Sequence, residues 1–182
     1  MSPSSAAVCR SVVAPLLCCT LLAGVTACGG DDEDASATPS GTSSAERQKF
    51  AKTRFVANAG IAAGATYQWI VKPFRAGKFK SGADGRKMAL VKAGLAGTLA
   101  YNRLKAATKN AQGDPTLARA VAPLTAGIDA LKDLPSKLRK GESTESVVNS
   151  FDGVINSVKD AGKGAGAEVT NRVPSAAELA RG

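Results

Sequence analysis

Histidine is absent from the 182-residue sequence, and its four cysteines all lie within the first 28 residues. The chain after Cys28 therefore has no imidazole base, no thiol nucleophile and no His/Cys ligand set for zinc or haem. It also has no disulfide of its own. These absences exclude Ser-His-Asp and Cys-His hydrolases, zinc hydrolases and haem proteins with His or Cys ligands.

Aromatic residues are also scarce, at 4% of the sequence. A core must then be built mainly from Ala, Val, Leu and Ile, which favours closely packed helices over a sheet sandwich. The length after Cys28 suffices for one domain of ordinary size. We therefore expect an all-α fold, a bundle of about four helices in up-down order, preceded by a signal peptide and a tether.

An apolar run from Val12 to Val25 follows a single basic residue, Arg10. Its length is typical of the apolar region of a secretory signal peptide and is too short for a comfortable transmembrane span. The run ends in Val25-Thr26-Ala27-Cys28.

This tetrapeptide resembles the lipobox of the bacterial lipoprotein family. The resemblance implies cleavage before Cys28, a diacylglyceryl and acyl lipid on that residue, and attachment to the extracytoplasmic face of the cell membrane. It implies no other cofactor. The alternatives are an ordinary secretory signal that ends in an incidental cysteine, or an uncleaved membrane anchor.

The chain after the lipobox changes composition twice, and we divide it accordingly. Residues after Cys28 are first acidic, at Asp31-Asp32-Glu33-Asp34, and then rich in Ser, Thr, Pro and Gly, without a large aliphatic side chain. Such a segment is typical of a flexible tether. The predicted parts are a signal peptide over 1–27, a lipidated cysteine and tether over 28–45, a helical domain over 46–166 and a weakly ordered tail over 167–182.

Apolar residues recur at helical spacing in four segments of the domain. The segments are about 46–71, 86–110, 115–140 and 143–166. Lys72-Pro73 is expected to end the first. Asp114 should cap the third with Pro115 in its first turn, Pro123 and Pro135 should kink or split it, and Gly141 should end it. Ser143 or Thr144 should cap the fourth.

Small residues form narrow faces on the first two segments, at Gly60 and Gly64 and at Gly94 and Gly97. Glycine lowers the stability of a helix interior by about 1 kcal/mol, so close packing must offset it. Each face is expected to receive another helix. The alternative is that these faces pair with a second envelope protein, which would make the chain a helical scaffold or interaction protein.

Cations concentrate between Lys72 and Lys92, where seven Lys or Arg residues accompany one acid, Asp84. From Ala45 onward the chain has 23 basic and 11 acidic residues, so it should attract polyanions such as anionic lipid headgroups or wall polymers rather than nucleic acid. The candidate anion-binding residues are Lys72, Arg75, Lys78, Lys80, Arg86 and Lys87. The alternative is a solvated loop whose Phe74 and Phe79 dock on the core.

No constellation of residues predicts catalysis. Asp129 and Asp133 lie four residues apart on the third segment but should face water, and no phosphate-binding glycine motif is present. Tyr67, Trp69 and Tyr101 either pack in the ordinary way or line, with Phe74, a ligand groove between the first two helices. We expect a membrane-anchored, non-catalytic binding or structural module with no metal site, similar to small helical lipoproteins of high-GC Gram-positive bacteria that have no assigned activity. An enzyme is the least supported class.

Overall fold

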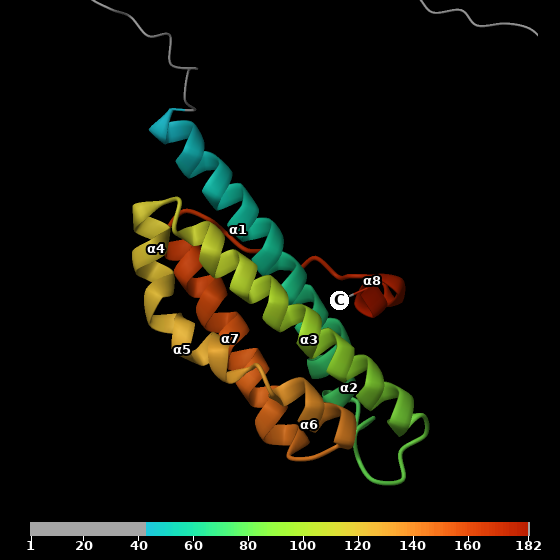
Figure 1. The fold of residues 1–182 in the computed structure, drawn as a ribbon. Helices are drawn as coiled ribbons and strands as arrows, with labels where there is room; N and C mark the ends of the chain where they lie inside the picture. Colours follow the sequence, from blue (N-terminus) through green and yellow to red (C-terminus); the bar gives the residue numbers. More distant parts are fainter. Residues whose placement is uncertain (1–42, 182) are drawn as a thin grey trace, which may run out of the picture. The chain divides into compact units, whose positions relative to one another are not determined.

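A computed structural model describes residues 43–181, and in this range every regular element is helical (Figure 1). The long helices are α1 (Ser44–Thr66), α3 (Arg86–Ala111) and α7 (Thr144–Gly164). The shorter ones are the π-helix η1 (Tyr67–Val71), α2 (Lys72–Arg75), α4 (Pro115–Val121), the 3-10 helix η2 (Ala122–Leu124), α5 (Thr125–Ala130), α6 (Leu134–Lys140) and α8 (Ala176–Arg181). The predicted all-α class is confirmed.

The bundle has four passes in alternating directions (Figure 1). The helix α1 packs most extensively on α3, which returns antiparallel to it, and α7 also packs on α1. The third pass is the chain of short helices α4, η2, α5 and α6. Pro123 lies in η2 and Pro135 in the first turn of α6, so each proline begins a new short helix where the sequence predicted a kink or split.

The core is built from small and aliphatic side chains, as the composition predicts. Phe55 and Phe151 are the large rings that are fully buried at its centre, among Ile, Leu, Val and Ala. Ala59, Ala62 and Ala63 of α1 have almost no exposed surface, which allows the close approach of α3. The predicted scarcity of aromatic packing is thus compatible with a continuous core.

The start of α4 is fixed by the predicted cap. The Asp114 carboxylate accepts a hydrogen bond from the Leu117 N–H at 2.8 Å, while Pro115 occupies the first turn. Asp114 is buried, and the Lys52 ammonium of α1 lies 3.6 Å from its second oxygen. Gly141 ends α6 in the left-handed conformation at a φ of 74°, also as predicted.

Two local predictions are wrong. The helix does not end at Lys72-Pro73 but continues to Arg75, because η1 widens the backbone: the Lys72 N–H bonds the Tyr67 carbonyl, five residues earlier. A proline in a regular α-helix would crowd the carbonyl four residues before it, and the wider turn accommodates Pro73. At the start of α7, Ser143 adopts a left-handed φ of 45° and its side chain caps nothing.

The C-terminal segment contributes to the core, which corrects the boundary expected at residue 166. Ala165 and Gly166 form the turn that ends α7, and beyond it Ala167 and Val169 are buried between exposed neighbours, as in an extended chain with one face on a core. The segment then crosses α1, and Leu179 of α8 is buried near its end. Residues 167–181 therefore belong with the bundle, because their apolar side chains complete it.

This segment also occupies the first of the small-residue faces. The Arg172 N–H donates to the Gly60 carbonyl at 2.8 Å, and the backbone around Arg172 lies directly against Gly64. The expectation of a helix on this face is wrong, since an extended, non-helical segment of the same chain lies there. The second face receives α6 as predicted, with Pro135 and Arg139 packed against Gly94 and with Phe151 and Pro135 against Gly97.

Candidate anion-binding surfaces

The basic loop lies at the far end of the bundle from Ser43. It connects α2 to α3 and turns through Gly77, Gly82 and Gly85, all with positive φ. Lys78, Lys80 and Lys87 extend into solvent from it. We call these three residues, together with Lys140, the basic tip.

Lys140 joins the basic tip because α6 ends against the start of α3. The Arg86 guanidinium and the Leu90 side chain of α3 lie next to Gly141, the residue that follows Lys140. Lys140 is exposed, as are Lys137 and Arg139 in the same short helix. The structure thus adds a cation of α6 that follows Lys87 by 53 residues in the sequence (140 − 87).

Arg86 serves the loop rather than a ligand. Its Nε donates a hydrogen bond to the Phe79 carbonyl at 2.9 Å, and the side chain is half-buried beside Gly141 at the C-terminus of α6. Cations near a helix C-terminus are stabilised by the helix dipole. Arg86 therefore helps to hold the loop in place, and its Nε is used in that contact.

The two phenylalanines of the loop pack inward. Phe79 is buried in the core cluster, Phe74 is half-buried against it, and their ring centroids lie 6.2 Å apart at 50°. This is the arrangement in which the rings anchor a solvated loop. They are thus not available as apolar contacts interleaved with the cations.

Lys72 and Arg75, the remaining candidates, are exposed on α2. Arg75 faces α7, where it lines a small cavity with Tyr67, Asp152 and Lys159. This cavity combines two cations with one carboxylate. Arg75 is part of it, so we do not count Arg75 in the basic tip.

The predicted acidic pair is not assembled for chemistry. Asp129 accepts a hydrogen bond from the Lys105 ammonium at 2.7 Å on the surface, which raises the pKa of Lys105, and Asp133 is exposed. Within residues 43–181 no group of three or more acidic side chains lies close enough to hold a metal ion. No helix in that range is long and apolar enough to span a membrane.

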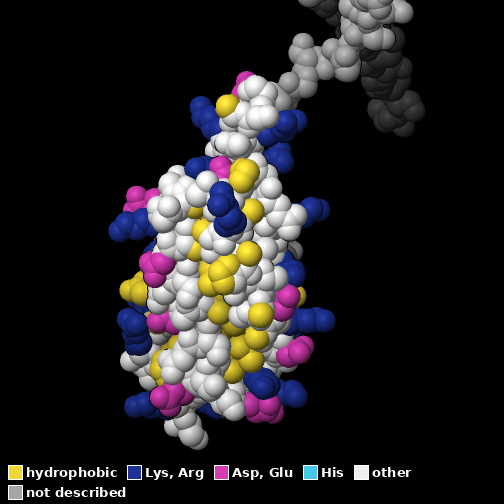
Figure 2. Space-filling model, turned by 90° about the vertical axis from the view of Figure 1, so that its left-hand side faces the viewer, with side chains coloured by type: hydrophobic (Ala, Val, Ile, Leu, Met, Phe, Trp, Pro, Cys, Tyr) yellow, Lys and Arg dark blue, Asp and Glu magenta, His cyan; other side chains and the backbone are white. Residues whose placement is uncertain are grey.

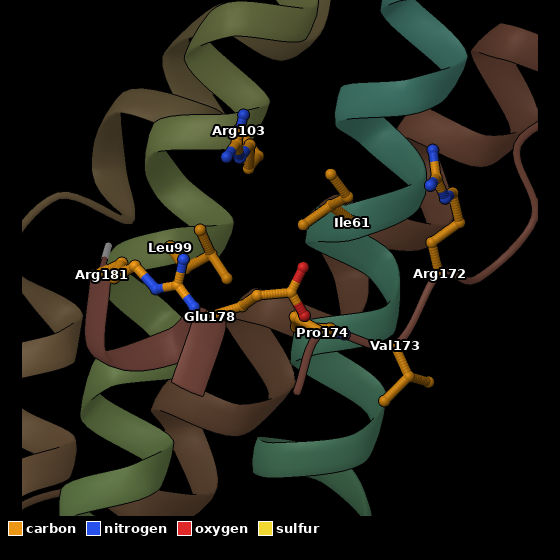
Figure 3. Close-up of a pocket in the computed structure, with 8 residues that line it drawn as sticks. All are labelled: Ile61, Leu99, Arg103, Arg172, Val173, Pro174, Glu178 and Arg181. Carbon is orange, nitrogen blue, oxygen red and sulfur yellow. The ribbon is translucent and has the colours of Figure 1, made fainter. Parts of the chain in front are cut away.

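A cavity of about 320 Å³ lies between α1, α3 and the C-terminal segment (Figure 3). Its apolar floor comes from Ile61, Leu99 and Pro174. Arg103 extends toward the opening from α3, and Glu178 and Arg181 of α8 lie across it. The remaining lining residues are Arg172 and Val173, whose side chains lie on the other side of α1 from Ile61 in this view.

The carboxylate in this cavity is held by its own helix. The Ser175 N–H and hydroxyl donate to Glu178 at 2.7 and 2.8 Å, and the Glu178 N–H donates back to the Ser175 hydroxyl at 3.3 Å. These bonds form a capping box at the start of α8. They lower the pKa of Glu178, and the nearby charges of Arg181 and Arg172 lower it further, so this carboxyl stays ionised at neutral pH.

No sequence pattern indicates this cavity as a site. Its residues come from positions 61 to 181, and five of the eight lie in the segment predicted to be a weakly ordered tail. One of the two interpretations of the aromatic residues places them in a groove between the first two helices. A cavity does lie there, but aliphatic side chains and arginines line it instead of those rings. Trp69 is not among the lining residues, although its Nε1 donates a hydrogen bond to the Pro174 carbonyl at 3.2 Å.

A second, apolar groove lies between α5 and α7. It has a volume of about 530 Å³ and contains Pro123, Leu124, Leu131, Leu134 and Val154. Figure 2 shows hydrophobic side chains in a band down the middle of the face on which α4 and α5 lie, with Lys and Arg side chains around its edges. This groove has no cation among its lining residues and is therefore a different kind of surface from the two basic ones.

The predicted lipidation site, Cys28, and the cleavage motif Val25, Thr26 and Ala27 lie outside the described residues. Comparison with models of protein families, with characterised proteins and with solved structures finds no match to this chain. Function must therefore be argued from the residues and surfaces described above.

Proposed function

We propose that this chain is a bacterial lipoprotein held to the extracytoplasmic face of the cell membrane through a lipidated Cys28. Its helical domain is a non-catalytic binding module that contacts anionic polymers of the envelope through the basic tip. The lipobox supports the first part, and the chain after Cys28 lacks the His and Cys side chains on which many enzymes depend.

The position of the basic tip carries the second part of the proposal. α1, η1 and α2 follow one another without a break from Ser44 to Arg75, which is 32 residues or about 48 Å of helix. The membrane anchor would join the domain at the start of α1, and the cations lie at the other end (Figure 1). A domain joined through the start of α1 has its cations at the end remote from the tether, where wall polymers can reach them.

Three lysines of the basic tip provide the test. Replacing Lys78, Lys80 and Lys87 by glutamine is expected to weaken binding to a teichoic-acid-type polymer at least about tenfold at low salt, since each lysine near an anionic surface contributes on the order of 1 kcal/mol. Binding of the unmodified chain should itself weaken as salt is raised, because salt screens exposed charges. Sedimentation with the polymer at two salt concentrations measures both effects.

The matched control replaces three exposed lysines elsewhere, Lys109, Lys132 and Lys163, by glutamine. It removes the same net charge and should keep most of the binding. Equal losses in the two variants would mean that net charge alone acts, and unchanged binding in the tip variant would refute the proposal. Stronger retention on anionic liposomes than on the polymer would assign the tip to headgroups instead.

A further inference from the structure

We propose that the cavity lined by Arg103, Arg181 and Glu178 binds a small organic oxyanion, a carboxylate or phosphate that bears a short apolar group. This site is separate from the basic tip and does not depend on the function proposed for it. It lies between α1, α3 and α8, whereas the tip lies on the loop before α3 and at the end of α6.

The cavity has the two features that such a ligand requires. Ile61, Leu99 and Pro174 supply an apolar floor, and two guanidinium groups lie at the opening above it (Figure 3). A guanidinium presents paired N–H donors that match the two oxygens of a carboxylate or phosphate. A volume of about 320 Å³ is at the small end of the range of ligand sites.

Arg103 is free to take part in this recognition. Its Nη1 donates to the Asn58 side-chain oxygen at 3.3 Å, which is a neutral partner at long distance. The two ion pairs among residues 43–181, Lys52 with Asp114 and Lys105 with Asp129, lie elsewhere. Arg103 thus projects over an apolar floor and makes no ion pair within the part of the chain that the structure describes.

Glu178 gives the site an internal competitor. Its carboxylate lies among the cations that an oxyanion would contact, and its bonds to Ser175 keep it there. An incoming anion must be accommodated beside this negative charge, so affinity should rise when the charge is removed. Glutamine can retain the capping hydrogen bonds of α8, which makes Glu178→Gln a test of charge with the helix cap kept.

Trp69 supplies the readout, because it is the only tryptophan and its Nε1 donates to the carbonyl of Pro174 in the cavity floor. A ligand that contacts Pro174 alters the surroundings of this indole. The experiment titrates the full chain, held in nanodiscs of zwitterionic lipid, with hexyl phosphate, with hexanoate and with inorganic phosphate. Trp69 emission is followed in each titration.

The site is supported if hexyl phosphate or hexanoate gives saturable binding and inorganic phosphate binds at least about tenfold more weakly, since the apolar floor then contributes. Arg103→Gln and Arg181→Gln should each weaken binding about tenfold, and Glu178→Gln should strengthen it about threefold. The control Arg119→Gln, an exposed arginine of α4, should leave it unchanged. No saturable change with any probe would overturn the proposal, as would weaker binding in Glu178→Gln.

Discussion

A chain that ends at Gly166 is expected to lose at least about 3 kcal/mol of the free energy of unfolding. The truncation removes Ala167, Val169 and Leu179, which are between 1% and 4% exposed, and burial of an aliphatic side chain the size of Val or Leu stabilises by about 1.5–3 kcal/mol. It also exposes the face of α1 that contains Gly60 and Gly64. Urea unfolding followed by circular dichroism measures the change as a lower midpoint.

A second truncation separates the two parts of this segment. A chain that ends at Ser175 loses α8 and Leu179 but keeps the extended segment over α1. Its urea midpoint should therefore lie between those of the full chain and the shorter truncation. Trp69 emission should stay close to that of the full chain, because the Pro174 carbonyl is retained. Equal midpoints in all three chains would contradict the assignment of residues 167–181 to the core.

Replacing Gly64 by alanine is expected to lower the free energy of unfolding by about 1–3 kcal/mol, the usual range for a methyl group forced into a packed interface. A Cβ at Gly64 would collide with the carbonyl of Arg172, and backbone atoms cannot turn aside as the end of a flexible side chain can. The extended segment around Arg172 must then move away from α1. Denaturant unfolding at neutral pH checks the value.

Gly153 provides the matched control in another helix. It is exposed in α7, and a Cβ built there meets nothing within 4 Å. Gly153→Ala should therefore raise the free energy of unfolding by about 0.5–1 kcal/mol, because alanine has the higher helix propensity and restricts the unfolded chain. Opposite signs for the two substitutions are the expected result. A stabilising Gly64→Ala would show that the C-terminal segment does not lie on the Gly60 and Gly64 face of α1.

The helical passes of the bundle could be predicted because their signals are local. Helical spacing of apolar residues, the Asp114-Pro115 start and the Gly141 stop act within one turn of the chain, and each has the predicted place in the structure. The prolines also divide the third pass as expected. The local pattern gave a wrong prediction at Pro73, because the π-helix before it lets the helix continue and no sequence pattern indicates that π-helix.

The C-terminal segment could not be predicted from helical spacing, because residues 167–175 do not form a helix. Its only local signal is the alternation of buried Ala167 and Val169 with exposed Gly166, Glu168 and Thr170. One of the two buried residues is an alanine, so the pattern has little contrast in hydrophobicity. The path of the segment is set by its contacts with Gly60 and Gly64 of α1, which are distant in sequence.

Site residues could be identified from the sequence where they are close together along the chain, and not where distant segments bring them together. The basic tip was visible in sequence because its loop is continuous, although Lys140 joins it only through the packing of α6 on α3. The role of Arg86 depends on a carbonyl seven residues away and on the end of a distant helix. Arg103, Glu178 and Arg181 line one cavity only because the C-terminal segment folds back across α1.

The central claim is that Cys28 holds this domain at the membrane, and its most direct test is the intact mass of the protein extracted from membranes of a bacterium that processes lipoproteins. The mass should correspond to a chain that starts at Cys28 and carries a diacylglyceryl group, and two acyl chains would make the anchor durable where one would be marginal. A chain that retains Met1, or one that starts at an unmodified residue, would contradict the claim.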